Sequence, residues 1–201
     1  MVMTPESLKR ALKYISKETH LRTKSYRMLS DGVQGEFLQA FSLMVRPKAV
    51  LEIGTFTGYA TLSLSRGLAP GGVVDTIEID DQRVDLFKSA FEMAGQDAIN
   101  TYSGDAKEII PTLDRMYDIV YIDANKREYS AYYDLVFPKV SHGGYILVDN
   151  VMWSEKIFAQ KSHLDWQTEA IIAFNEKIQN DPRIEVTTLW VRDGLSVLQK
   201  L

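Results

Sequence analysis

Short apolar runs rich in valine and isoleucine alternate along the chain with stretches of helical spacing. The runs at 49–54, 72–80, 99–105, 118–124 and 143–150 are typical of strands, and the stretches at 58–69, 81–94, 105–114 and 126–140 are typical of helices. This alternation predicts an α/β fold whose parallel sheet is buried on both faces. Two further helices, at about 5–18 and 31–46, are expected before the first strand, with Pro47 closing the second.

The C-terminal segment predicts a different strand geometry. Two strand-like runs within 184–200 are joined around Arg192, Asp193 and Gly194, and an Asp-Gly pair between such runs favours a hairpin. We therefore expect a Rossmann-like, doubly wound, mostly parallel seven-stranded sheet with an antiparallel C-terminal strand hairpin and helices on both faces. No repeat or linker interrupts residues 1–201, so they are expected to form one domain in which the helical segment 1–47 covers the active site.

Composition narrows the classes of function. Lys and Arg number 23 and Asp and Glu 27, and the net charge of −4 argues against a global field for nucleic acid. The absence of cysteine excludes a disulfide framework, a thiolate nucleophile and a cysteine zinc site. The N-terminus lacks the apolar region of a signal peptide, and no apolar run is long enough to span a bilayer. These features predict a cytoplasmic protein without membrane contact.

The first strand ends in a candidate cofactor loop that runs directly into a helix. Gly54 and Gly58 would let a ligand approach the backbone, although glycine at such a turn often serves packing alone. Glu78 lies 24 residues after Gly54, where an acidic residue binds ribose hydroxyls, and Asp80 is the alternative. The G-x-x-x-G spacing differs from that of dinucleotide loops, and Glu52 would repel a pyrophosphate. Because a carboxylate suits the ammonium and sulfonium of S-adenosylmethionine, we favour that cofactor over NAD.

Polar side chains also end the fourth and fifth strands. Asp123 follows one of them, and Asp149 and Asn150 follow the other. Ligands gather at the carboxyl ends of neighbouring strands in doubly wound sheets, and oxygen donors suit Mg²⁺, Ca²⁺ or Mn²⁺ better than zinc. Each residue alone could instead cap a helix or a turn. Lys126 is a candidate general base, because a nearby cation would lower its pKa.

Five ordered segments carry a family resemblance: VLEIGTFTGYATL, DTIEID, GDAKEIIPTL, YDIVYIDANKREY and GGYILVDNVMW. They resemble the cation-dependent class I O-methyltransferases, which include catechol and caffeoyl-CoA O-methyltransferases, and the resemblance covers nearly the whole chain. It implies that Asp123, Asp149 and Asn150 bind the metal, and that Lys126 and Asp123 are catalytic. The cofactor-binding residues it implies are Met28, Ser30, Glu52, Gly54, Gly58, Tyr59, Thr61, Glu78, Asp105, Ala106 and Asp123.

The resemblance also implies an activity. A homodimer would move the methyl group of S-adenosylmethionine to a hydroxyl of a small catechol-like or phenylpropanoid substrate, with Mg²⁺, or else Mn²⁺ or Ca²⁺, as the cation. Trp153 would form an aromatic wall. Where many relatives have serine this chain has Ala60, so that backbone amides or the Thr61 hydroxyl would have to bind the cofactor carboxylate.

Two other functions remain open. One is an O-methyltransferase acting on a tRNA hydroxyuridine, which the locally basic N-terminal region favours and the acidic net charge disfavours. That basic run could equally be a solvated helix face or a dimer surface. The other is a non-catalytic module that binds S-adenosylmethionine. Binding to tRNA would weaken steeply with salt, because phosphate contacts release counterions.

Overall fold

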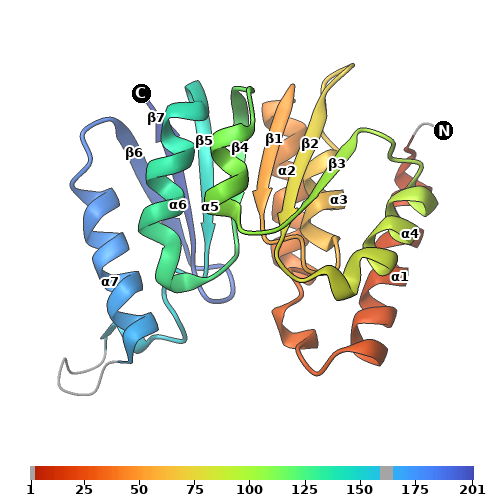
Figure 1. Cartoon of the computed structure of the whole chain (residues 1–201), viewed down its shortest axis with the longest axis horizontal. Coiled ribbons are helices and arrows are strands. Elements are labelled where there is room, and N and C mark those ends of the chain that lie inside the picture. Colours follow the sequence, from red (N-terminus) through yellow and green to blue (C-terminus); the bar gives the residue numbers. More distant parts are fainter. Residues whose placement is uncertain (1–2, 159–164) are drawn as a thin grey trace. The chain divides into compact units, whose positions relative to one another are not determined.

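Seven strands form a mixed sheet in the structure, a computed structural model that describes residues 3–158 and 165–201. The strand order is β3-β2-β1-β4-β5-β7-β6 (Figure 1). The pairs β1–β2, β2–β3 and β4–β5 are parallel, whereas β5–β7 and β6–β7 are antiparallel. The expected mostly parallel seven-stranded sheet with an antiparallel C-terminal hairpin is therefore confirmed. The chain divides into two compact units, Met1–Asp105 and Ala106–Leu201, which are described in turn.

The first unit contains three parallel strands and the N-terminal helices. The strands are β1 (Ala49–Ile53), β2 (Val73–Glu78) and β3 (Ile99–Ser103). The helices are α1 (Pro5–Arg22), α2 (Gly32–Val45), α3 (Tyr59–Ser65) and α4 (Val84–Ala94), with short 3-10 turns η1 (Tyr26–Met28) and η2 (Asp81–Arg83). Every residue of β1 is buried, which explains why its sequence is a continuous apolar run interrupted only by Glu52.

Helix α1 begins at a capping box and buries one face against α4. Thr4 and Ser7 exchange side-chain and backbone hydrogen bonds at its start, which satisfies two amide groups that the helix leaves open. Leu8, Leu12 and Ile15 are buried in the same apolar cluster as the phenylalanines of α4. The helix runs four residues beyond the expected end at residue 18. In this last turn the buried Thr19 hydroxyl donates to Ile15 O at 2.7 Å.

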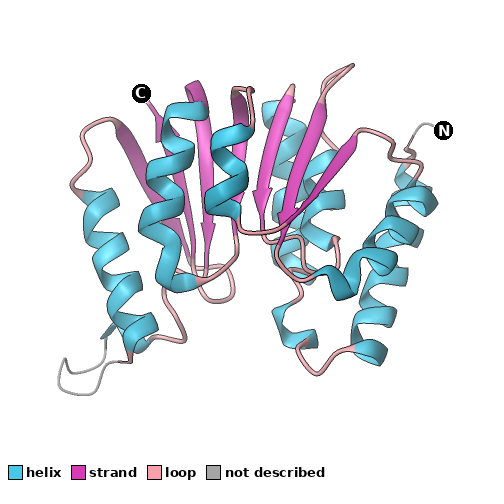
Figure 2. Ribbon diagram, in the orientation of Figure 1, coloured by secondary structure: helices cyan, strands magenta, loops and turns pink. Residues whose placement is uncertain are grey.

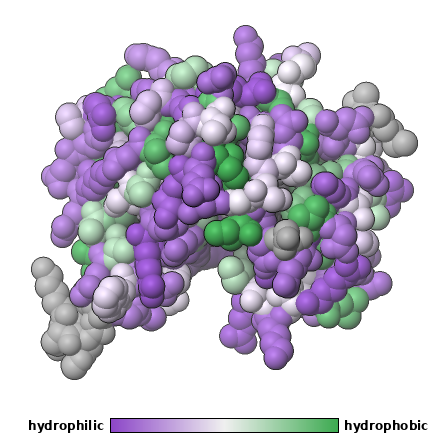
Figure 3. Space-filling view, in the orientation of Figure 1, coloured by the Kyte–Doolittle hydropathy of each residue, from purple (hydrophilic) through white to green (hydrophobic). Residues whose placement is uncertain are grey.

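The second unit contains the other four strands. These are β4 (Tyr117–Ile122), β5 (Val140–Asp149), β6 (Ile184–Leu189) and β7 (Leu195–Lys200). The helices are α5 (Ala106–Ile109), α6 (Tyr129–Val136) and α7 (Trp166–Gln179), with 3-10 turns η3 (Ile110–Thr112), η4 (Lys126–Glu128), η5 (Phe137–Lys139) and η6 (Lys156–Phe158). Figure 2 shows α6 and α7 lying over one face of these strands. Their outward side is mainly hydrophilic in Figure 3, as expected of helices that bury one face.

Helix α7 is absent from the sequence-based prediction. Its buried residues Thr168, Ile171, Phe174 and Ile178 recur at helical spacing. Asp165 caps its start, because the carboxylate accepts the backbone N–H of Thr168 at 2.8 Å. The missed signal is weakened at the start of the helix, where the apolar Trp166 is 78% exposed.

The C-terminal hairpin forms where Asp193 and Gly194 predict it. The strands β6 and β7 pair from Leu189↔Leu195 outward, and Gly194 takes a positive φ of 83° in the connection. A Cβ at Gly194 would lie 2.6 Å from Met152 Cγ, so this glycine also permits close packing against the segment after β5. Among the described residues, no helix has the length and apolar character needed to cross a membrane.

Candidate active site

The loop between β1 and α3 is shaped by glycine. Gly54 has a φ of 100° and donates its N–H to Ile77 O on β2 at 2.9 Å. Gly58, at a φ of 87°, stands immediately before α3, and a Cβ there would lie 2.7 Å from Phe91 Cε1 and 2.9 Å from Phe87 Cβ. Gly58 is therefore required by the backbone conformation and by packing on α4, whether or not a ligand also approaches it.

Glu78 is held in place at the end of β2. Its Oε2 accepts the N–H of Phe56 at 2.6 Å, and its Oε1 accepts the N–H of Asp80 at 2.9 Å. The residue is 8% exposed. A carboxylate has about four lone-pair sites, so two remain for the hydroxyls of a ribose. Asp80 instead accepts the Gln82 N–H at 3.0 Å and pairs with Arg83, so it caps the start of η2.

Glu52 is buried beneath the cofactor loop and is hydrogen-bonded to other side chains of the protein. It is fully buried, and its Oε2 accepts the hydroxyl of Thr76 at 2.5 Å and that of Thr61. Thr55 extends this network through a 2.6 Å contact between its hydroxyl and that of Thr76. The hydroxyl proton of Thr61 is therefore already donated to Glu52. This leaves the backbone amides as the better substitutes for the hydroxyl that is missing at Ala60.

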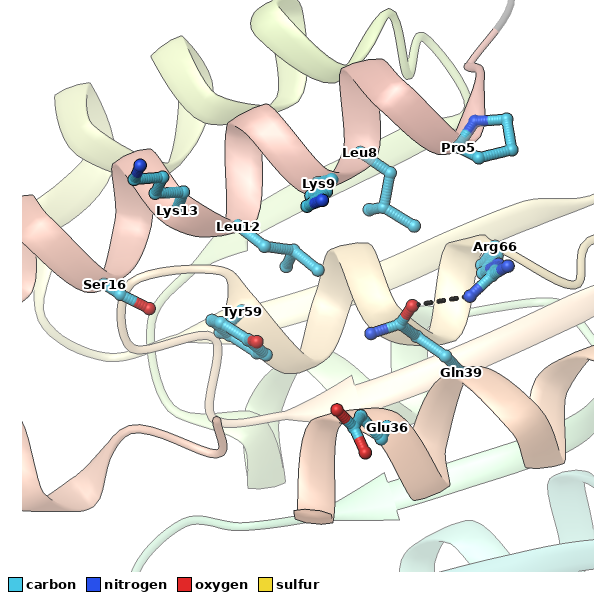
Figure 4. A pocket seen from close by; sticks show the side chains of 10 residues that line it. All are labelled: Pro5, Leu8, Lys9, Leu12, Lys13, Ser16, Glu36, Gln39, Tyr59 and Arg66. Carbon is cyan, nitrogen blue, oxygen red and sulfur yellow. Dashed lines mark hydrogen bonds between the residues drawn. The ribbon is translucent and has the colours of Figure 1, made fainter. Parts of the chain in front are cut away.

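Tyr59 points into a groove formed by α1, α2 and α3 (Figure 4). The groove has a volume of about 520 Å³, and Leu8 and Leu12 of α1 form part of its wall. Gly35 of α2 makes room for the Tyr59 ring, since a Cβ at this position would overlap it. Burial raises the pKa of Tyr59, and the negative charges of Asp31 and Glu36 add to the effect.

The remaining predicted cofactor residues differ in accessibility. Met28 is 63% exposed on η1, whereas Ser30 is 6% exposed. Asp105 is half-buried and follows Gly104, whose N–H donates to Glu78 O at 2.9 Å. Ala106 is buried at the start of α5, in the second unit. Among these, Met28, Ser30 and Asp105 lie within the first unit with Glu78.

Strand register places two predicted metal ligands side by side in the second unit. Ile122 of β4 pairs with Val148 of β5 in parallel register, so Asp123 and Asp149 follow at the same level of neighbouring strands. Adjacent strands lie about 4.8 Å apart. Asp149 is 4% exposed, and Asn150, the next residue, has a φ of 57°.

The donors at this strand end fit a hard cation by their chemistry. They are two carboxylates and one amide, all of them oxygen ligands. No group of three or more His, Cys, Asp or Glu residues that could hold a metal occurs within 3–158 and 165–201, so Asn150 would be an essential third ligand. A carboxylate as buried as Asp149 also needs compensation by a positive charge or by hydrogen bonds.

Lys126 already faces one of these carboxylates. Its Nζ lies 2.7 Å from Asp123 Oδ1, and the two side chains are 11% and 18% exposed. Burial lowers the pKa of Lys126, but Tyr129 and Asp123 oppose this effect and hold the pKa above its usual value. The protein's own groups thus stabilise the ammonium form, contrary to the lowered pKa expected of a catalytic base.

Two features near these residues were not recognised from the sequence. Burial raises the pKa of Tyr129 well above its ordinary value, and its hydroxyl donates to Asp149 O at 2.9 Å. Trp153, Ser154 and Glu155 form a run of positive φ values of 49°, 54° and 61°. The buried indole N–H of Trp153 finds no hydrogen-bond partner among the described residues. Backbone strain such as these positive φ values concentrates at functional sites, but no sequence pattern predicts it.

Known proteins resemble this chain over most of its length. Caffeoyl-CoA O-methyltransferase 2 from Petunia hybrida is 27% identical over 189 residues, which cover 87% of this chain and 77% of that protein. The O-methyltransferase TomG from Streptomyces achromogenes, involved in tomaymycin synthesis and solved in complex with SAM, shares 26% identity and a TM-score of 0.85. That match covers 100% of this chain and 92% of the other.

A Bacillus cereus O-methyltransferase solved in complex with SAH shows the same likeness, with 26% identity and a TM-score of 0.85. This match covers 100% of this chain and 93% of that one. Both structures share the Rossmann-like sheet described above. Residues 3–201 also match the O-methyltransferase family as a whole. The chain therefore belongs to the O-methyltransferase family, whose members use S-adenosylmethionine as the methyl donor.

Proposed function

We propose that this methyltransferase depends on a divalent cation and methylates a hydroxyl of a small catechol-like or phenylpropanoid molecule. The observation that carries the proposal is the register of β4 and β5, which sets Asp123 beside Asp149. Asn150 follows directly, and Lys126 pairs with Asp123. Metal-assisted deprotonation of a hydroxyl requires oxygen ligands for the cation and a nearby base, and this strand end provides both kinds of group.

The residues of this site divide the work between binding and proton transfer. Asp123, Asp149 and Asn150 would hold Mg²⁺, or else Mn²⁺ or Ca²⁺, and the bound cation would lower the pKa of a substrate hydroxyl. Lys126 would accept the hydroxyl proton on Nζ. Its ammonium must first lose a proton, and Asp123 now opposes that loss. If Asp123 bound the cation, its negative charge would stabilise the Lys126 ammonium less, and the pKa of Lys126 would fall.

The first unit would bind the methyl donor. Glu78 would accept the ribose hydroxyls with the oxygen lone pairs that its two backbone contacts leave. We assign Glu52 an electrostatic role, in which its buried charge favours a cationic ligand at the loop of Gly54. The same proposal includes a homodimeric assembly in which segment 1–47 covers the site. It also includes further cofactor-binding residues, namely Met28, Ser30, Gly58, Tyr59, Thr61, Asp105 and Ala106.

A methyl-transfer screen tests the proposal. Purified protein with labelled S-adenosylmethionine is offered catechols, caffeoyl esters and bulk tRNA, each with Mg²⁺ and with excess chelator. We expect transfer to the small aromatic hydroxyls only when Mg²⁺ is present, and its loss in Asp149→Ala. Full activity of Asp149→Ala in chelator would contradict the metal dependence. Salt-sensitive methylation of tRNA alone would show that the substrate is tRNA and not a small aromatic molecule. Cofactor binding without any methyl transfer would favour a non-catalytic module that binds S-adenosylmethionine.

A further inference from the structure

Tyr129 connects the strand end that carries the proposed metal ligands to the helical layer. It is the first residue of α6 and is fully buried. Its hydroxyl donates to the main-chain oxygen of Asp149 at 2.9 Å. A buried phenol needs a hydrogen-bond partner, and many carbonyl groups could serve. This one belongs to the peptide bond that joins Asp149 to Asn150.

The conformation of that peptide determines where two ligands point. Asn150 has a φ of 57°, in the left-handed region that residues other than glycine rarely adopt. Such a conformation persists only when the surrounding structure holds it. The hydrogen bond from Tyr129 restrains the direction of the carbonyl in the Asp149–Asn150 peptide. It therefore restricts the directions of the side chains that leave from either side.

The same tyrosine also contacts the proposed base. Lys126 Nζ lies 5.2 Å from the centroid of the Tyr129 ring. Tyr129 is the third residue after Lys126, so the two side chains share one side of the turn that leads into α6. Lys126 therefore rests on Tyr129 while its ammonium pairs with Asp123 at 2.7 Å.

The Tyr129 ring itself is fixed by α7. It meets Phe174 edge to face, with ring centroids 5.6 Å apart. Phe174 is fully buried. A ring packed in this way cannot move its hydroxyl away from Asp149 without disturbing the helical layer. The hydrogen-bond donor is therefore fixed in position relative to the ligand strand.

We propose that Tyr129 is a positioning residue for the cation, fixing the Asp149–Asn150 peptide so that both side chains are preset as ligands. The inference rests on the proposed metal-dependent function. Groups that orient metal ligands from behind change metal affinity by roughly 10–100-fold when they are removed. Tyr129 acts through Asp149 and Asn150, and it need not touch substrate or cofactor.

The test compares Tyr129→Phe with a matched control on the same helix. Tyr133 is also buried, its ring lies 6.3 Å from that of Phe174, and its hydroxyl bonds Asp181 Oδ2 at 2.8 Å, away from the ligand strand. Tyr133→Phe therefore removes an equivalent hydroxyl without touching Asp149. Mn²⁺ binding to the full chain is followed by electron paramagnetic resonance, independently of turnover. Activity is then titrated against Mg²⁺.

We expect Tyr129→Phe to weaken Mn²⁺ binding on the order of tenfold and to shift the Mg²⁺ titration equally, while Tyr133→Phe matches the wild type. Saturating Mg²⁺ should restore most of kcat in Tyr129→Phe, with KM for S-adenosylmethionine unchanged. Wild-type Mn²⁺ affinity in Tyr129→Phe, or equal weakening in both variants, would overturn the inference while leaving the metal site itself intact. A wild-type chain that binds no Mn²⁺ would overturn the proposed function, and this inference with it.

Discussion

Substitution of Gly58 by alanine should destabilise the first unit through two separable effects. The backbone at Gly58 has a φ of 87°, and a left-handed conformation costs a residue with a Cβ about 1–2 kcal/mol. The added methyl would lie 2.7 Å from Phe91 Cε1 and 2.9 Å from Phe87 Cβ, and such overpacking costs about 1–3 kcal/mol. We therefore expect Gly58→Ala to lower the free energy of unfolding by about 2–5 kcal/mol.

Two other glycines separate these contributions. Gly71 has a φ of 75° with nothing within 4 Å of an added Cβ, so Gly71→Ala should show the backbone cost alone. Gly67 has no positive φ, but a Cβ there would overlap the backbone of Ser42, so Gly67→Ala should show the packing cost. Urea unfolding at constant m-value gives all three differences. A Gly58→Ala variant no less stable than Gly71→Ala would show that the contacts with Phe87 and Phe91 add no packing cost. Lost affinity for SAH at unchanged stability would instead make Gly58 a ligand contact.

Three further outcomes follow from the contacts described. Glu78→Gln should reduce SAH affinity on the order of 10–100-fold by calorimetry, whereas Asp80→Asn should not; equal losses would reassign the ribose contact. Lys126→Met should slow turnover on the order of 10²–10⁴-fold with SAH affinity retained, and an unchanged rate at neutral pH would remove this lysine from the chemistry. Arg183 and Tyr133 hydrogen-bond Asp181 and hold its pKa below the usual range, so Asp181 stabilises the fold above about pH 4 and less as the pH falls. Asp181→Asn should therefore be destabilised at pH 7, with a difference that shrinks below pH 4; a constant difference would contradict the assignment.

The sequence predicts the sheet because each buried strand is a short continuous run of apolar residues. The apolar runs that form β1, β2, β4 and β5 are buried on both faces, and such strands read as continuous hydrophobic segments. Parallel register then determines that Asp123 and Asp149 meet, since equal offsets from paired residues end at the same edge. The periodicity of helix α7 is less clear in the sequence because its first residue, Trp166, is apolar but exposed.

Interactions between distant residues set the limit of prediction within each unit. The commitment of the Thr61 hydroxyl to Glu52 depends on how α3 packs on β1, which no spacing reveals. The direction of Tyr59 depends on the absence of a side chain at Gly35 in another helix. Tyr129 looks like an ordinary core aromatic in the sequence. Only the fold shows that its hydroxyl meets the Asp149 carbonyl.

The segment after β5 and the C-terminal hairpin turn are joined by hydrogen bonds, so each stretch depends on the sequence of the other. Val151 N–H donates to Gly194 O at 3.2 Å, Met152 N–H donates to Asp193 O at 2.9 Å, and Ser154 N–H donates to the Asp193 carboxylate. Chimeras that graft the 151–155 segment of a relative would therefore place foreign amides against a native turn. Recombination between family members should tolerate crossovers that move both stretches together, and it should reject those that split them.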